Sequence, residues 1–233
     1  MKSLVVGLIT LVMGVAVGSG ARAYEAPPDY EAPPTDQPVL SEEPSPTELP
    51  GLDASLRFGY VYPFGNVMAG PGNAMSDIFS GGGFFGLDLG FRINAYVTVG
   101  ALVQYAFLAV KDSACSSCSG SMTRLGGQVL LRIPVENSRV LPWLGLAAGY
   151  EWMSVDGSSG TVGAKGFELA TLQGGVDLLG GRHASLGPFI SFSIGRYDTT
   201  TASGDASVSP MGEKDIHEWL QIGLKGTVTF SKK

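Results

Sequence analysis

Few residues of this chain have side chains whose spacing indicates chemistry. Cys115 and Cys118, the two cysteines, are separated by two serines in a segment rich in serine and glycine. A redox role would need a thioredoxin-like βαβ context, and a zinc site would need about four ligands, and the neighbouring sequence supplies neither. The pair is therefore predicted to close a small surface disulfide, which fits an oxidising compartment.

The two histidines, His183 and His217, are the candidates for a general base. Nothing in the sequence places a serine within hydrogen-bond reach of either, so a serine hydrolase is not indicated. His183 is expected in a short turn, and His217, beside Trp219, is expected at an interfacial rim. No phosphate loop, metal cluster or nucleotide motif is present. We therefore expect no enzyme activity, no cofactor and no metal.

The larger chemical set consists of charged residues that share one face of alternating segments. A buried charge is costly without a partner, so these residues are predicted to form a paired, hydrogen-bonded network. Counting along the segments places Arg57 near Asp88, Arg124 near Glu151, and Arg132 near Asp177. The complete set is Arg57, Asp88, Arg92, Arg124, Arg132, Glu151, Asp177 and Lys225.

These charges must be positioned by strands, because from residue 52 onward the hydrophobic pattern has a period of two. Leu52, Leu56 and Phe58, for example, fall on the face opposite Asp53 and Arg57. Most segments have about nine or more residues, the length that a tilted strand needs to cross a membrane. The eight segments are 52–60, 85–92, 97–107, 124–133, 143–152, 166–179, 186–195 and 219–230.

Composition and faces favour a membrane barrel over a soluble one. Charged residues make up 15% of the chain, against about 25% in soluble domains. One face is bulky and apolar, and the other holds glycine and small polar residues, as expected for a lipid-facing wall around a crowded lumen. The sequence thus predicts an all-β, eight-stranded antiparallel up-and-down transmembrane β-barrel. A soluble lipocalin-like ligand-binding barrel, with its apolar face inward, is the alternative fold.

The connections support this fold, because short turns alternate with long loops as in outer-membrane barrels. Short turns are expected near residues 94–95, 136–138 and 181–183. Long loops are expected at 62–82, 111–122, 155–165 and 198–214. An outer aromatic girdle is predicted from four residues, with Trp143 inside near the lower rim. The girdle residues are Tyr105, Tyr150, Trp152 and Trp219.

Two segments precede the predicted barrel, which occupies residues 51–233. Residues 1–23 have a charged start, an apolar stretch and an Ala-Arg-Ala site, and they predict a cleaved signal peptide. Residues 24–50 hold eight of the fourteen prolines and seven acidic residues, and they are predicted to be a disordered periplasmic linker. A cell-wall or protein partner for this linker is a further hypothesis. The linker has seven acidic and no basic residues, so the acidic pI comes from the linker, and a nucleic-acid partner has no electrostatic support.

Residues 140–230 resemble the small bacterial outer-membrane β-barrel proteins of the eight-stranded, outer-membrane-protein-A-like class. The motifs on which the resemblance depends are typical of strands and turns and indicate no chemistry. They are Gly187-Pro188-Phe189, Gly195-Arg196-Tyr197, His217-Glu218-Trp219-Leu220 and Gly223-Leu224-Lys225-Gly226. The resemblance implies location in the outer membrane, contact with its lipid and lipopolysaccharide, and insertion by the barrel-assembly machinery. Many family members end on an aromatic residue, whereas here Phe230 is followed by Ser231-Lys232-Lys233.

Function is predicted from the width of the barrel. An eight-stranded barrel is about wide enough for its own side chains, so the charged set is expected to fill the lumen. The protein is accordingly predicted to be a monomeric structural or surface-interaction protein. A narrow channel for ions or small solutes, lined by the same residues, is the alternative function.

Overall fold

The computed structural model describes residues 50–67, 74–135, 138–158, 160–179, 183–202, 205–210 and 215–231. The chain divides into two units, Met1–Glu42 and Glu43–Lys233, and the fold described here belongs to the second. The predicted signal peptide and all but the last residue of the predicted linker lie outside the described residues.

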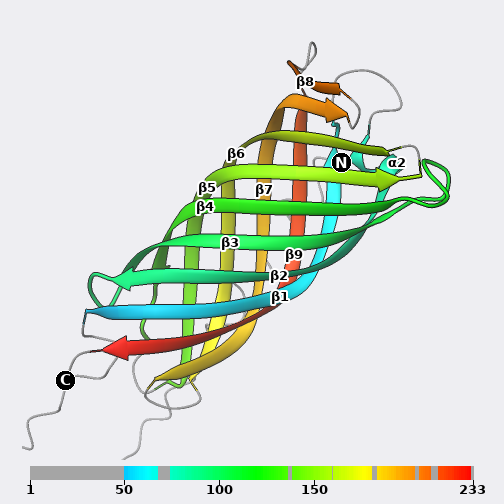
Figure 1. The fold of residues 1–233 in the computed structure, drawn as a ribbon. Helices are drawn as coiled ribbons and strands as arrows, with labels where there is room; N and C mark the ends of the chain where they lie inside the picture. The colour runs from blue at the N-terminus through cyan, green and yellow to red at the C-terminus, as the bar shows by residue number, and fades with distance from the viewer. Residues whose placement is uncertain are drawn as a thin grey trace, which may run out of the picture. The chain divides into compact units, whose positions relative to one another are not determined.

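The second unit is a closed antiparallel barrel (Figure 1). Strands β1 to β7 pair in chain order, β7 then pairs with β9, and β9 closes the barrel on β1 from Gly51↔Ser231 to Gly65↔His217. The short β8 pairs with the end of β7, outside this circuit of eight strands. The strands are β1 Gly51–Gly65, β2 Phe79–Arg92, β3 Val97–Val110, β4 Ser119–Arg132, β5 Val140–Gly157, β6 Gly160–Leu179, β7 Ala184–Ala202, β8 Asp205–Pro210 and β9 Ile216–Ser231.

The alternating sequence pattern produces two different walls. The apolar residues point outward, with Leu52, Leu89 and Leu146 between 59% and 68% exposed. The charged and amide residues of the other face point inward and are buried. The prediction of an eight-stranded transmembrane barrel is confirmed, and the lipocalin-like alternative is wrong, because in that fold the apolar face would be the inner one.

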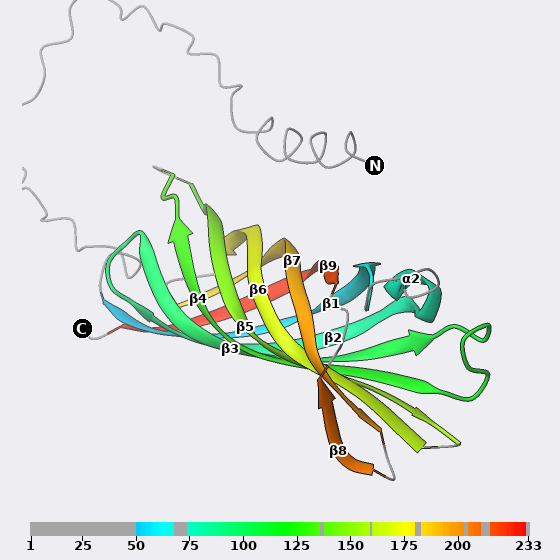
Figure 2. The ribbon, with the colours of Figure 1, turned by 90° about the horizontal axis from the view of Figure 1, so that it is seen from above.

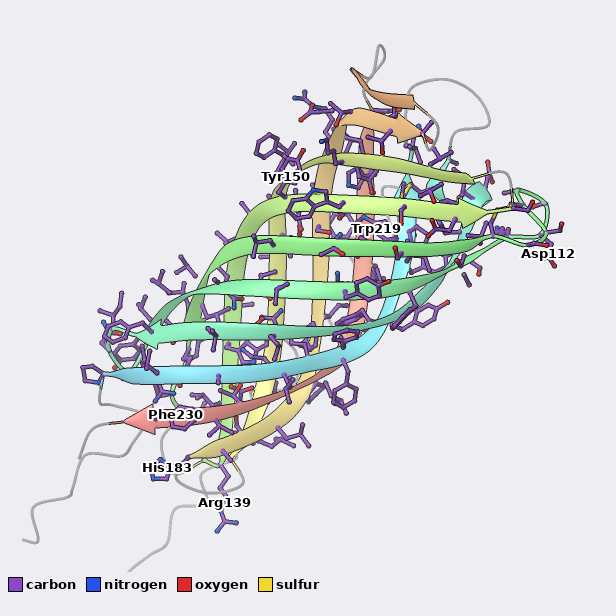
Figure 3. All side chains as sticks on the ribbon, viewed as in Figure 1. Asp112, Arg139, Tyr150, His183, Trp219 and Phe230 are labelled. Carbon is purple, nitrogen blue, oxygen red and sulfur yellow. A yellow bond between two sulfur atoms is a disulfide. The ribbon has the colours of Figure 1, made fainter. Side chains whose placement is uncertain are left out.

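The two ends of the barrel differ in their connections. One end, called the turn end here, is where β2 ends and β3 begins, where β4 ends and β5 begins, and where β6 ends and β7 begins. The other, called the loop end, carries the four-residue helix α2 Met75–Ile78, residues 111–118, the tip of the β5–β6 hairpin and β8. Figure 3 shows Asp112 at the loop end, opposite Arg139 and His183 at the turn end. None of the described helices has the length and apolarity to cross a membrane.

Two of the predicted long loops are largely strand. Within 198–214, β7 continues to Ala202 and Asp205–Pro210 form β8. Residues 155–165 belong almost entirely to strands, because β5 and β6 continue as a hairpin until Gly157 pairs with Gly160. Gly160 has a positive φ of 129°, a conformation that glycine adopts without steric cost at a tight turn. The serine and glycine residues of this segment lie around the tight turn at the tip of two long strands. Figure 2 shows this hairpin projecting beyond the barrel beside the β3–β4 hairpin.

Candidate functional site

The lumen of the barrel holds the candidate functional residues, which fall into three groups along the strands. The group nearest the turn end is the lower cluster, formed by Asp53, Arg92, Arg132 and Thr229. Asp53 Oδ1 accepts from Arg92 Nη2 at 2.9 Å and Asp53 Oδ2 accepts from Arg132 Nη2 at 2.7 Å. The Thr229 hydroxyl donates to Asp53 Oδ1 at 2.8 Å. One buried carboxylate is therefore shared by two guanidinium groups that come from β2 and β4.

The middle of the lumen is crossed by the central network, formed by Arg57, Asp88, Gln128 and Gln173. Arg57 donates to Asp88 Oδ2 at 2.6 Å, to Gln173 Oε1 at 2.6 Å and to Gln128 Oε1 at 2.9 Å. Gln173 Nε2 donates to Gln128 Oε1 at 2.8 Å. These residues lie on β1, β2, β4 and β6, which are not all neighbours in the sheet. Their side chains therefore meet across the lumen and obstruct it.

Lys225 and Trp143 extend this obstruction on the side facing the turn end. The Lys225 ammonium lies 4.4 Å from the centroid of the Trp143 ring, and the Arg57 guanidinium lies 5.2 Å from the centroid of Phe189. Both cations are almost completely buried. Cation–π contacts of this kind stabilise a charge where water is excluded.

The group nearest the loop end is the upper cluster, formed by Arg124, Glu151, Glu168, Tyr197, His217 and Trp219. Glu151 is fully buried and accepts from Arg124 Nε at 2.7 Å, from Trp219 Nε1 at 3.2 Å and from the Tyr197 hydroxyl. Arg124 Nε also lies 3.2 Å from Glu168 Oε2. The rings of Tyr197 and His217 stack with centroids 3.9 Å apart and an interplanar angle of 11°. Here one guanidinium is shared by two carboxylates.

An apolar layer, called the roof here, continues the inner wall from the upper cluster toward the loop end. Met122 is two residues beyond Arg124 on β4, and Met153 is two residues beyond Glu151 on β5, so both share the inward face. Met75 of α2 and Phe79 at the start of β2 are fully or almost fully buried in the same apolar group. The roof consists of Val61, Met75, Phe79, Leu108, Met122 and Met153.

The structure places every residue of the predicted charged set in the lumen, with exposed fractions of 6% or less. It brings Arg57 to Asp88 and Arg124 to Glu151, which are pairs on neighbouring strands. Arg132 and Asp177 lie close enough to interact electrostatically, but the ion pair of Arg132 is made with Asp53. Arg92 also belongs to the Asp53 cluster.

Sequence reasoning missed two carboxylates that belong to these clusters. Asp53 stood on the correct face but was not included in the set, although it lies four residues before Arg57. Glu168 was missed because strict alternation places it outward together with Ala170. The register between β5, β6 and β7 shifts at this point, so Leu169 and Ala170 are both exposed and Glu168 turns inward. A bulge of this kind leaves no clear signal in the sequence.

The expected rim positions of His217 and Trp219 are wrong. Trp219 is completely buried and His217 is 1% exposed, and both belong to the upper cluster. Their alternation with Glu218 and Leu220 already placed them on the inner face, whereas the rim assignment followed only from their position near a strand end. Tyr150 and Trp152, in contrast, lie on the outer wall, where their rings pack 4.8 Å apart and Tyr150 contacts Phe167.

Cys115 and Cys118 form the predicted disulfide in the β3–β4 connection. The bridge lies against the tip of the β5–β6 hairpin, because a Cβ atom added at Gly157 would be 2.7 Å from Cys118 Sγ and 3.7 Å from Cys115 Sγ. The disulfide thus fills the space between two hairpin tips. Within the described ranges, no group of three or more histidine, cysteine, aspartate or glutamate side chains is arranged to hold a metal ion.

Comparison with known proteins identifies the architecture. The chain is similar to the crystal structure of Neisserial surface protein A, with a TM-score of 0.54 and 12% identity, over 77% of this chain and 97% of that one. It is also similar to outer membrane protein AlkL, solved by solid-state NMR in lipid bilayers, with a TM-score of 0.51 and 13% identity, over 93% of this chain and 98% of that one. The fold is that of the small outer-membrane β-barrels.

At this low sequence identity, the similarity to solved structures shows the fold but does not show the function. The outer membrane protease OmpT from Escherichia coli also matches, but its TM-score of 0.39 supports no argument about activity. No protein-family model matches the chain, and no curated protein matches it. The function of this outer-membrane-type barrel must therefore be argued from its own lumen and walls.

Proposed function

We propose that the protein is an integral outer-membrane β-barrel with a closed lumen, which serves a structural or surface-interaction role. The observation that carries this proposal is the central network. Arg57 reaches from β1 to Gln173 on β6 and to Gln128 on β4 through direct hydrogen bonds. A path for hydrated ions would have to break these bonds and strand buried charges, which is costly.

The outer wall supports membrane insertion. Large apolar side chains cover it, and the aromatic residues Tyr60, Tyr105, Tyr150 and Trp152 lie on its loop-end half. Bulky aliphatic residues beside an aromatic belt match the hydrocarbon core and one interface of a bilayer. Lipid and lipopolysaccharide are accordingly the proposed environment of this wall. The β3–β4 and β5–β6 tips would then face the cell exterior and offer the surface for interactions.

The upper cluster supports a non-enzymatic role. His217 is stacked on Tyr197 and is 1% exposed, so a substrate could not reach its ring without displacing the roof. General acid–base catalysis requires the base to come within hydrogen-bond distance of the substrate. The histidine therefore has a structural position in this fold.

The remaining parts of the proposal concern the chain ends and assembly. Residues 1–23 would be a cleaved signal peptide and residues 24–50 an acidic periplasmic linker, as their composition predicts. Because the number of barrel strands is even, the start of β1 and the end of β9 lie together at the turn end. In this proposal the turn end faces the periplasm, where a linker of this kind would lie. Insertion by the barrel-assembly machinery and a monomeric state complete the proposal.

Conductance measurements test the closed lumen. The refolded mature protein, shown to be folded by faster gel migration before heating, is expected to produce no steady conductance in a planar bilayer. The double variant Arg57→Ser/Gln173→Ser shortens two residues of the central network and serves as a comparison. Steady conductance of the wild-type protein, with ion selectivity that changes in this variant, would replace the closed barrel with the channel.

A pair of arginine substitutions tests lipid contact. Leu146 is 62% exposed in the middle of the outer wall on β5, and Leu52 is 59% exposed beside the turn end on β1. We expect Leu146→Arg to lower the free energy of unfolding in lipid vesicles by about 2–4 kcal/mol and Leu52→Arg by about 0–1 kcal/mol, because the cost depends on depth. Equal and small effects would mean that this wall does not face lipid.

A further inference from the structure

A cavity separates the central network from the upper cluster. Its volume is about 20 Å³, and it is bounded by Arg57 and Asp88 on one side and by Arg124 and Glu168 on the other. Gln104 and Gln221 complete the part of its wall that matters here. A volume of about 10–15 Å³ is enough for one water molecule, so this cavity has room for one or two.

Three nitrogen donors on this wall find no acceptor among the described residues. They are Gln104 Nε2, Gln221 Nε2 and Arg124 Nη2, and all three atoms are buried. Gln104 is 7% exposed, and the atom of this residue that lacks a partner is Nε2. Buried polar groups without a protein partner are as a rule satisfied by ordered water, because leaving them unpaired costs about 1–3 kcal/mol.

The charges around the cavity decide the chemistry of its ligand. Arg57 and Arg124 contribute two positive charges, while Asp88 and Glu168 contribute two negative charges. A monatomic anion would accept from the three donors but would add a net charge beside two carboxylates. A neutral molecule that accepts from N–H groups and donates to carboxylates matches both features of the wall. Water has this chemistry.

We propose that this cavity is an internal water site in which one or two ordered water molecules bind Gln104, Gln221 and Arg124. No direct hydrogen bond joins the side chains described above for the upper cluster to those described for the central network. The bound water links these two groups. The closed lumen is thus hydrated between the central network and the upper cluster.

The first test is direct observation of the ligand in a high-resolution crystal structure. We expect ordered solvent density within hydrogen-bond distance of Gln104 Nε2 and of at least one of Gln221 Nε2 and Arg124 Nη2. Crystals soaked in bromide are expected to show no anomalous peak in the cavity. An absence of density in a well-ordered lumen, or a bromide peak, would overturn the proposal.

The second test uses the sign of a stability change. If water binds Gln104, Gln104→Met removes a satisfied hydrogen bond, and the urea midpoint is expected to fall. If the cavity is dry, the same change removes an unpaired buried amide, and the midpoint is expected to rise. Gln128→Met is the matched control, because Gln128 is bound directly by Arg57 and Gln173. This control should lower the midpoint in either case, and a rise for Gln104→Met beside a fall for Gln128→Met would reject the water site.

Discussion

The two ends of the lumen solve the same electrostatic problem with opposite ratios of charge. In the lower cluster, Asp53 is shared by Arg92 and Arg132. In the upper cluster, Arg124 is shared by Glu151 and Glu168. Each cluster is therefore held together by its one shared residue. This residue is the acid Asp53 at the turn end and the base Arg124 at the loop end.

The surroundings of the two clusters differ as well. The lower cluster is completed by a hydroxyl, that of Thr229. The upper cluster is completed by aromatic donors and is covered by the roof. Burial makes an unpaired charge more costly. The comparison teaches that the identity of the shared residue, rather than the number of ion pairs, should decide which substitutions destabilise the barrel most.

The largest expected effects come from removing the two shared residues. Asp53→Asn removes the carboxylate that two buried guanidinium groups share, and Arg124→Gln removes the guanidinium that two buried carboxylates share. Each substitution should lower the free energy of unfolding by about 3–5 kcal/mol. Arg92→Gln and Glu168→Gln should cost less, because the shared residue keeps one partner. Urea unfolding in vesicles measures all four. If the arginine substitution were the more destabilising one in both clusters, the opposite ratios of acidic to basic residues would not determine stability.

The roof gives the next largest effect, and it sharpens the contrast between the ends. Met122→Ala leaves a cavity in the apolar layer beside Arg124, and large-to-small changes of this kind cost about 2–5 kcal/mol. Its matched control is Leu125→Ala on the same strand, which is 54% exposed on the outer wall and should cost less in a lipid vesicle. A loss for Leu125→Ala equal to that for Met122→Ala would show that the roof adds no packing of its own.

Much of this arrangement could be predicted from the period of the sequence. A period of two assigns each residue to one wall, and it places Arg57, Arg124 and Lys225 in the lumen, where the structure has them. The same period gives the number and order of the barrel strands. However, the period shows only whether a side chain points into the lumen or toward the outside. It does not show which side chain is the partner across the lumen, or how high the residue lies relative to residues on distant strands.

The failures follow from that limit. Arg132 on β4 donates to Asp53 on β1, and these strands are not neighbours, so height along the strands placed Arg132 and Asp177 at the same end but did not identify Asp53 as the partner. Glu168 depends on a local irregularity that shifts the alternation by one residue. The β5–β6 hairpin extends beyond the segments 143–152 and 166–179 that the alternation assigned to strands, since β5 continues to Gly157 and β6 begins at Gly160.

The central network lies between the two clusters and pairs one acid with one base. A double-mutant cycle of Asp88→Asn and Arg57→Gln is expected to give a coupling energy of about 1–3 kcal/mol, because the pair is buried and the atoms are 2.6 Å apart. In a water-filled channel the coupling should fall below about 1 kcal/mol, as for exposed pairs. Arg57→Gln alone should cost more than Asp88→Asn alone, since Arg57 also binds Gln128 and Gln173.

The smallest expected effect concerns a polar contact outside the lumen, at the loop end. Asn66 Nδ2 donates to Asp215 Oδ2 at 2.8 Å, and the amide of Ile216 donates to Asp215 Oδ1 at 2.8 Å. These hydrogen bonds, the one from Asn66 foremost, hold the pKa of Asp215 below its ordinary value. A lowered pKa means that the contact stabilises the fold above the ordinary pKa and loses this contribution as the pH falls below about 4. Asn66→Ala should raise the pKa of Asp215, measured by NMR, with little change in the urea midpoint at neutral pH, because water screens the carboxylate. An unchanged pKa would show that Asn66 does not bind Asp215 in solution, and a large fall in the midpoint would place this contact with the buried clusters rather than apart from them.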